Sequence, residues 1–136
     1  DELLNGDVVQ TTVAVPADAT LLAVQILLSN YGRNNSGFLD IKLHDSNGKH
    51  LGRRQLLNTE VEDDSFFTVP LTAPAKPERL TITLRAYAST PGDAISVMLN
   101  PNTQQDYQRN DKSQQGALCL NLLLEGWRLH SETFCR

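Results

Sequence analysis

One short segment of the sequence carries the side chains best suited to binding a ligand. Tyr31-Gly32-Arg33-Asn34-Asn35 offers a ring, a guanidinium and two amides within five positions. A ring presents an apolar face to a sugar, and guanidinium and amide groups bind hydroxyls and carboxylates. The segment therefore predicts a site for an acidic or neutral glycan. The alternative is a plain turn in which Asn34 and Asn35 satisfy backbone groups and Arg33 is solvated.

Tyr87, Tyr107 and Trp127 are further rings that a sugar site could use. Aromatic residues make up 6% of the chain, so few rings remain once the core is filled. The candidate ligand-binding residues are Tyr31, Arg33, Asn34, Asn35, Tyr107 and Trp127. One function that they indicate is a carbohydrate-binding module with a sugar site at the loop end of the fold.

Four carboxylates lie within five positions at Glu60, Glu62, Asp63 and Asp64. A pair of carboxylates is what a glycoside hydrolase requires, so the acidic loop 60–64 indicates an alternative, enzymatic function. Loop carboxylates also suit Ca²⁺, but the D-x-D-x-D-G spacing is absent from the sequence. A solvated loop explains the cluster better than either site.

Two histidines, His44 and His50, flank a predicted hairpin with Asp45 beside them. Two imidazoles and a carboxylate could ligate a metal, although such residues are more often solvated strand ends. The sequence has no G-x-S-x-G nucleophile motif, and neither cysteine has the surroundings of a nucleophile. We therefore expect no enzyme, no metal and no cofactor.

Cys119 and Cys135 are the two cysteines of the chain, and no C-x-x-C motif for zinc or redox chemistry is present. In an oxidising compartment a bridge would tie the C-terminal tail to the last predicted strand. A loop of this size would add about 3 kcal/mol of stability. We predict this disulfide, with two unrelated thiols as the alternative.

The bulk composition disfavours two classes of partner. The net charge of −4 provides no basic field for phosphates, so we expect no nucleic-acid partner. No apolar run approaches the roughly 18–20 residues that cross a bilayer, so we expect no membrane span in this chain. Because position 1 is Asp, we expect an excised piece or a mature product, with any signal or anchor outside it.

Apolar and polar residues alternate along most of the chain, which predicts strands with one face in a core. Turn signals such as Asn47-Gly48 and Pro91-Gly92 separate the alternating segments. The predicted strands are Val8–Val15, Thr20–Ser29, Phe38–His44, His50–Leu57, Phe66–Leu71, Arg79–Ala88, Ala94–Asn100 and Ala117–Glu125. This pattern predicts an all-β fold, an antiparallel two-sheet β-sandwich, jelly-roll-like, with about eight strands.

We expect a single domain over residues 1–136, with its core at about 8–125 and a C-terminal tail at 126–136. The segment 100–116 is polar apart from Tyr107 and predicts a long solvated loop. In the tail, Trp127 is predicted to pack on the sandwich.

Five segments of the chain also carry a family resemblance. They are Val9-Gln10-Thr11-Thr12, Leu22–Ile26, the loop Tyr31–Gly37, Leu39–Asp45 and Thr90–Val97. They resemble extracytoplasmic β-sandwich accessory domains of bacterial membrane proteins of cell-surface polysaccharide assembly, including glycosyltransferase-like proteins. The resemblance covers about Val8 to Glu125 and rests on turns and alternation. It implies a sandwich on the periplasmic or extracellular side of a bacterial membrane.

The leading hypothesis is a non-catalytic extracytoplasmic accessory module. Its partner would be a glycan that it positions, or another domain of a membrane protein on which it docks. The two alternatives are the carbohydrate-binding module with a loop-end site and the glycoside hydrolase built on the acidic loop.

Overall fold

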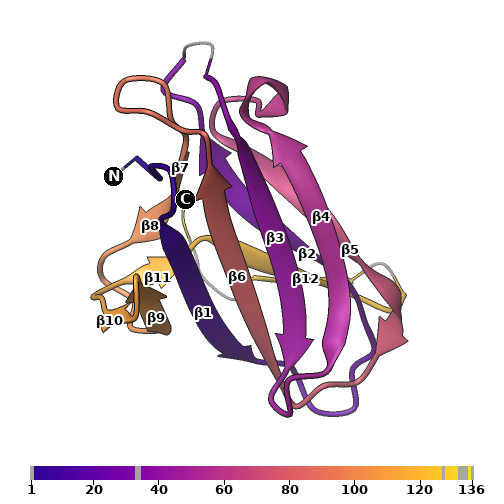
Figure 1. Ribbon diagram of the computed structural model, residues 1–136. Helices are drawn as coiled ribbons and strands as arrows, with labels where there is room; N and C mark the ends of the chain where they lie inside the picture. Colours follow the sequence, from indigo (N-terminus) through magenta and orange to yellow (C-terminus); the bar gives the residue numbers. More distant parts are fainter. Residues whose placement is uncertain (1, 33–34, 127, 132–134, 136) are drawn as a thin grey trace.

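The computed structural model describes residues 2–32, 35–126, 128–131 and 135. These residues form antiparallel strands packed in two layers (Figure 1). Among them are thirteen strands, one 3-10 turn and no α-helix, so no helix in the described part of the chain could cross a membrane. The predicted all-β, antiparallel sandwich is confirmed.

Sheet A is the six-stranded layer, with the strand order β10-β9-β1-β6-β3-β4. All of its pairings are antiparallel. Its strands are β1 (Val8–Ala14), β3 (Phe38–Asp45), β4 (His50–Leu57), β6 (Arg79–Tyr87), β9 (Asp106–Arg109) and β10 (Lys112–Ser113).

Sheet B is the opposite layer, with the order β13-β12-β2-β5 and with β7 joined to β2. Its strands are β2 (Leu21–Ser29), β5 (Ser65–Ala75), β7 (Ser96–Val97), β12 (Leu120–Leu124) and β13 (Arg128–Ser131). A small third sheet pairs β8 (Leu99–Asn100) with β11 (Ala117–Leu118), and the 3-10 turn η1 covers Asn58–Glu60.

The chain passes repeatedly from one layer to the other. β1 lies in sheet A, β2 in sheet B, β3 and β4 in sheet A, β5 in sheet B and β6 in sheet A. This alternation is typical of a jelly roll. Five of the six long strands start and end within one residue of their predicted bounds, whereas β5 continues to Ala75, four residues beyond its predicted end. The two last predicted strands are each divided, into β7 and β8 and into β11 and β12.

The core lies between the two sheets and consists mainly of aliphatic side chains. In β6, Leu80, Ile82 and Leu84 are fully buried while Arg79 and Arg85 are exposed, as the alternation predicts. Full burial of such a side chain stabilises the fold by roughly 1.5–3 kcal/mol. The core therefore determines which face of each strand remains open to a ligand.

The segment before β1 is fixed to the rest of the sandwich. Leu3 is 1% exposed and its amide donates to the carbonyl of Ile95 over 2.8 Å. Asp7 accepts hydrogen bonds from Arg109 and Asn110, at 2.8 and 3.0 Å. The N-terminal segment is thus tied both to the β6–β7 region and to the end of β9.

The prediction of a loop across residues 100–116 is wrong, because this segment contains the hairpin β9–β10. Tyr107 is 5% exposed and belongs to the core cluster. Its strand pairs with β1, where Tyr107 lies opposite Thr11. Pairing with β1 and burial of the Tyr107 ring thus place this polar segment in sheet A.

The C-terminal tail also contains a strand, because β13 pairs with β12 over Arg128–Ser131. The predicted disulfide is present: Cys119 and Cys135 are joined, with their Cα atoms 5.9 Å apart. Cys119 is buried, and its backbone bonds to Leu27 and Met98 fix it beside β2. The predicted packing of Trp127 lies outside the described residues.

β5 forms an edge of sheet B and lies beside β4, the edge strand of sheet A. The carbonyl of Thr68 points away from β2 and accepts a hydrogen bond from Arg54 over 2.9 Å. Pro70 follows two residues later in the same strand. Because alternate residues of a strand face the same neighbour, the nitrogen of Pro70 also faces this edge, where strands tolerate proline.

Candidate functional site

The outer face of sheet A places side chains from β4, β3 and β6 in three adjacent rows. The register between these strands defines the rows, because residues directly opposite one another project from the same face. The first row is Leu57, Phe38 and Tyr87; the second is Gln55, Asp40 and Arg85; the third is Arg53, Lys42 and Thr83.

The first row supplies aromatic surface. The rings of Phe38 and Tyr87 are stacked, with centroids 4.9 Å apart and an interplanar angle of 15°. Both rings are half-buried, and Leu57 beside them is 54% exposed. Gly37 precedes Phe38 at a positive φ of 85° and lies against the backbone of Tyr87, where a Cβ has no room. Close backbone packing therefore fixes the ring pair in place.

The second and third rows supply charge. Arg53 donates two hydrogen bonds to the carboxylate of Asp40, from Nε at 2.8 Å and from Nη2 at 3.1 Å. The Asp40 side chain is only 6% exposed, whereas that of Arg53 is 49% exposed. These hydrogen bonds and the charge of Asp40 raise the pKa of Arg53. Within the described part of the chain, Lys42 and Arg85 form no ion pair.

A hollow of about 320 Å³ lies over these rows. It is lined by Asp40, Lys42, Thr83, Arg85 and Tyr87. A hydroxyl, an ammonium, a guanidinium and a ring thus converge on one open depression. Such a surface can hold one or two sugar units against Tyr87 while the polar groups bind hydroxyls or charged substituents.

The loop predicted as a sugar site lies at one end of the sandwich, between β2 and β3 (Figure 1). Tyr31 is 44% exposed and adopts a positive φ of 60°. Asn35 is buried, and its side-chain amide donates to the carbonyl of Asn30 over 2.9 Å. Arg33 and Asn34 lie outside the described residues. Among the candidate residues, this loop therefore exposes Tyr31 and uses Asn35 to hold its own backbone.

Tyr107, the other candidate ring among the described residues, does not lie beside Tyr31. Tyr107 lies in β9, which pairs with β1, whereas Tyr31 follows β2 in the other sheet. Burial raises the pKa of Tyr107, and the positive charge of Arg109 partly opposes this shift. Trp127 lies outside the described residues. Whether these side chains bind a ligand stays a prediction.

One carboxylate of the acidic loop, that of Asp63, forms local hydrogen bonds. Asp63 accepts hydrogen bonds from the hydroxyl of Ser29 and the amide of Asn30, both at 3.1 Å. It therefore caps the end of β2. Among the described residues, no three His, Cys, Asp or Glu side chains lie together as a possible metal site.

The histidine pair is brought together, but without its neighbouring carboxylate. The rings of His44 and His50 are edge to face, with centroids 5.4 Å apart. Asp45 instead accepts hydrogen bonds from the amides of Asn47 and Lys49, at 2.9 and 2.8 Å, and so closes the β3–β4 turn.

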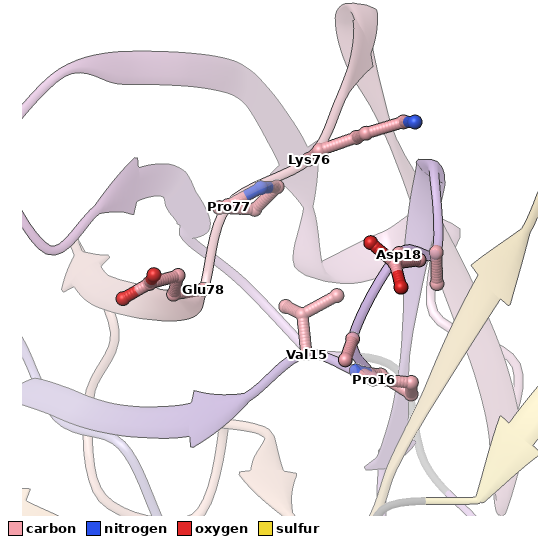
Figure 2. Close-up of a pocket in the computed structure, with 8 residues that line it drawn as sticks. Val15, Pro16, Asp18, Lys76, Pro77 and Glu78 are labelled. Carbon is pink, nitrogen blue, oxygen red and sulfur yellow. The ribbon is translucent and has the colours of Figure 1, made fainter.

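A second hollow, of about 440 Å³, lies between the β1–β2 and β5–β6 turns. Figure 2 shows these turns facing each other, with Val15 directed into the space between them. Its charged side chains are Asp18, Lys76 and Glu78, and its described lining contains no aromatic ring. Because its charges are of mixed sign and its other walls are Ala, Val and Pro, this hollow is less suited to a sugar than the one on sheet A.

The outer face of sheet B is more apolar than that of sheet A. Phe66 and Leu129 are 44% and 57% exposed, and the register places Leu129 beside Leu123.

No model of a known protein family matches the sequence, and no curated protein matches it. The candidate site is the outer face of sheet A, with its three rows and their hollow, because it combines an aromatic pair, charged side chains and a concave surface.

Proposed function

We propose that this protein is a non-catalytic β-sandwich module that binds a glycan on the outer face of sheet A. The observation that supports this proposal is the hollow beside the Phe38–Tyr87 ring pair, lined by Lys42, Thr83 and Arg85. The hollow is open to solvent rather than enclosed, which suits a chain of sugars better than a small buried ligand. The register of three adjacent strands holds its floor rigid, so little conformational entropy is lost on binding.

The same surface argues against hydrolysis. A glycoside hydrolase needs two carboxyl groups that flank the bond to be cleaved. The described lining of the hollow contains one carboxylate, Asp40, and both of its oxygens accept hydrogen bonds from Arg53. The module would therefore hold its glycan without altering it.

A location outside the cytoplasm belongs to the same proposal. The disulfide between Cys119 and Cys135 supports it, because such bonds persist mainly in oxidising compartments. There the module would position a cell-surface polysaccharide on the outer side of a bacterial membrane. Docking of a partner domain, the other expected role, would use the apolar outer face of sheet B around Phe66 and Leu129.

A glycan array followed by calorimetry tests the binding site. Tyr87→Ala removes the ring, and Thr83→Trp fills the hollow without touching the core. We expect each change to weaken binding at least about tenfold, which corresponds to about 1.4 kcal/mol. Tyr31→Ala is the matched control at the loop end and should bind as the wild type does.

Two results would overturn the proposal. One is wild-type protein that binds no glycan on the array. The other is binding that Tyr31→Ala abolishes while Tyr87→Ala and Thr83→Trp leave it unchanged, which would place the site in the β2–β3 loop. Circular dichroism of each variant confirms that a loss of binding does not reflect unfolding.

A further inference from the structure

We propose that the glycan bound on sheet A is acidic, a polysaccharide that carries carboxylates or sulfates along its chain. This inference rests on the proposed function and names the ligand class of the same site. The protein as a whole has a net charge of −4. Around the hollow the balance is reversed, because Lys42, Arg53 and Arg85 face a single carboxylate, that of Asp40.

Asp40 already forms an ion pair with one of these cations, Arg53. Its two oxygens accept from Nε and Nη2 of Arg53, a bidentate geometry in which the two charges offset each other. Arg85 lies directly opposite Asp40 in the register, yet the bidentate pair leaves its charge uncompensated. Arg85 is exposed and forms no ion pair within the described residues.

Lys42 adds a second uncompensated charge. It lies directly opposite Arg53 on β4 and opposite Thr83 on β6. Because Asp40 already offsets the charge of Arg53, Lys42 has no ion pair of its own within the described residues. An anionic ligand on this face would supply the missing counter-charge.

Lys42 and Arg85, which form no ion pair with any described residue, are placed for a repeating ligand. Lys42 and Arg85 belong to neighbouring strands and adjacent rows, so they are diagonal neighbours, about 7–8 Å apart at Cα. Tyr87 is the next outward-facing residue after Arg85 on β6 and lines the same hollow. A sugar ring on Tyr87 therefore has its charged substituent within reach of Arg85, and Lys42 is available to the next unit.

Affinity electrophoresis in gels that contain polygalacturonate tests the ligand class. The matched neutral polymer is its methyl ester, which has the same backbone without the charge. Dextran sulfate and dextran form a second pair, which distinguishes sulfates from carboxylates as the source of charge. We expect retardation by one or both acidic polymers, at least about tenfold weaker binding to the neutral partner, and weakening by salt because exposed charges are screened.

Variants test whether these two cations are responsible. Lys42→Gln and Arg85→Gln should each weaken binding to the acidic polymer several-fold, and the double variant at least about tenfold. Arg79→Gln is the matched control, since Arg79 is an exposed arginine on β6 that projects from the same outer face but lies outside the lining of the hollow. This control should reduce binding less than about twofold.

The outcomes separate the inference from the proposed function. Equal binding of neutral and acidic polymers that Thr83→Trp abolishes would overturn the acidic ligand and leave a glycan site on sheet A. Binding to duplex DNA as tight as that to the acidic polymer would overturn it as well, because it would show a site selective only for charge. Binding unaffected by Thr83→Trp, Tyr87→Ala and the cation variants would overturn both proposals.

Discussion

The guanidinium of Arg54 lies over the ring of Phe67, 4.4 Å from its centroid. The two residues belong to different sheets, Arg54 to β4 and Phe67 to β5. Since Arg54 also donates a hydrogen bond to the carbonyl of Thr68, one side chain joins the two layers at their open edge. Its neighbour Arg53 projects to the outer face of sheet A, as expected of adjacent residues on a strand.

Replacing Arg54 by Met should lower the free energy of unfolding by about 1–2 kcal/mol. The variant keeps most of the apolar stem but loses the cation–π contact and the hydrogen bond to Thr68. Gln55→Met, at the next and exposed position of β4, should change stability by less than about 0.5 kcal/mol. Urea unfolding measures both. Equal stabilities of the two variants would contradict a role of Arg54 in joining the sheets.

Reduction of the disulfide should increase the intact mass by two hydrogens and lower Tm. The bridge closes a segment with a sequence separation of 16, and a loop of this size is stabilised by about 3 kcal/mol. The double variant Cys119→Ala, Cys135→Ala should unfold at the same lower temperature with or without reductant. Native protein whose mass does not change and whose two thiols react with iodoacetamide would show that the bond does not form.

Protonation of Asp7 should destabilise the protein at acidic pH. Partial burial raises the pKa of Asp7, but the hydrogen bonds from Asn110, from the amide of Leu4 and from Arg109 together outweigh this effect. The pKa is therefore lowered from its ordinary value of 3.8. Because the folded state has the lower pKa, this contribution is fully present above the ordinary value and is lost as pH falls through the folded one.

Asp7→Asn should therefore cost about 2 kcal/mol at pH 7, with the difference from wild type shrinking as the pH falls below about 4. Urea unfolding at a series of pH values measures this difference. Asp18→Asn is the control, because Asp18 is an exposed turn residue with a positive φ that Asn also tolerates. A difference between Asp7→Asn and wild type that stays constant from pH 7 to pH 2 would rule out this contribution.

Gly37→Ala should damage both stability and glycan binding. A Cβ at Gly37 would collide with the carbonyl of Tyr87 and with the backbone of Ala88, and the residue has a φ of 85°. Gly48→Ala is a close control, because its φ is 81° but nothing lies within 4 Å of the added atom. We expect Gly48→Ala to cost about 1–2 kcal/mol from strain alone, and Gly37→Ala about 1–3 kcal/mol more. Similar costs for both would mean that the Gly37 backbone can move away from Tyr87.

Local alternation was sufficient to predict most of the strands. Leu80, Ile82 and Leu84 fill the core because every second residue of a strand shares a face. The alternation did not predict the burial of Asp40, which lies on the outer face of its strand and yet is covered by Arg53. That contact depends on the pairing of β3 with β4, which no single strand's sequence specifies.

The sequence did not predict the candidate site for the same reason. Phe38 and Tyr87 are distant in sequence and become neighbours only when β3 pairs with β6 in one register. A shift of the pairing by a single residue would place the two rings on opposite faces of the sheet. The Tyr31 loop is recognisable from the sequence because its side chains are adjacent along the chain, whereas the site on sheet A is assembled from three separate strands.

The proline at the free edge of β5 also bears on how the protein behaves at high concentration. A sheet edge with unpaired amides can add a strand from another molecule, which is the first step toward fibrils. Pro70 has no amide hydrogen to offer, and Arg54 already occupies the Thr68 carbonyl on that side. An incoming strand would find an interrupted ladder here, so this edge of the sandwich resists self-association through backbone pairing.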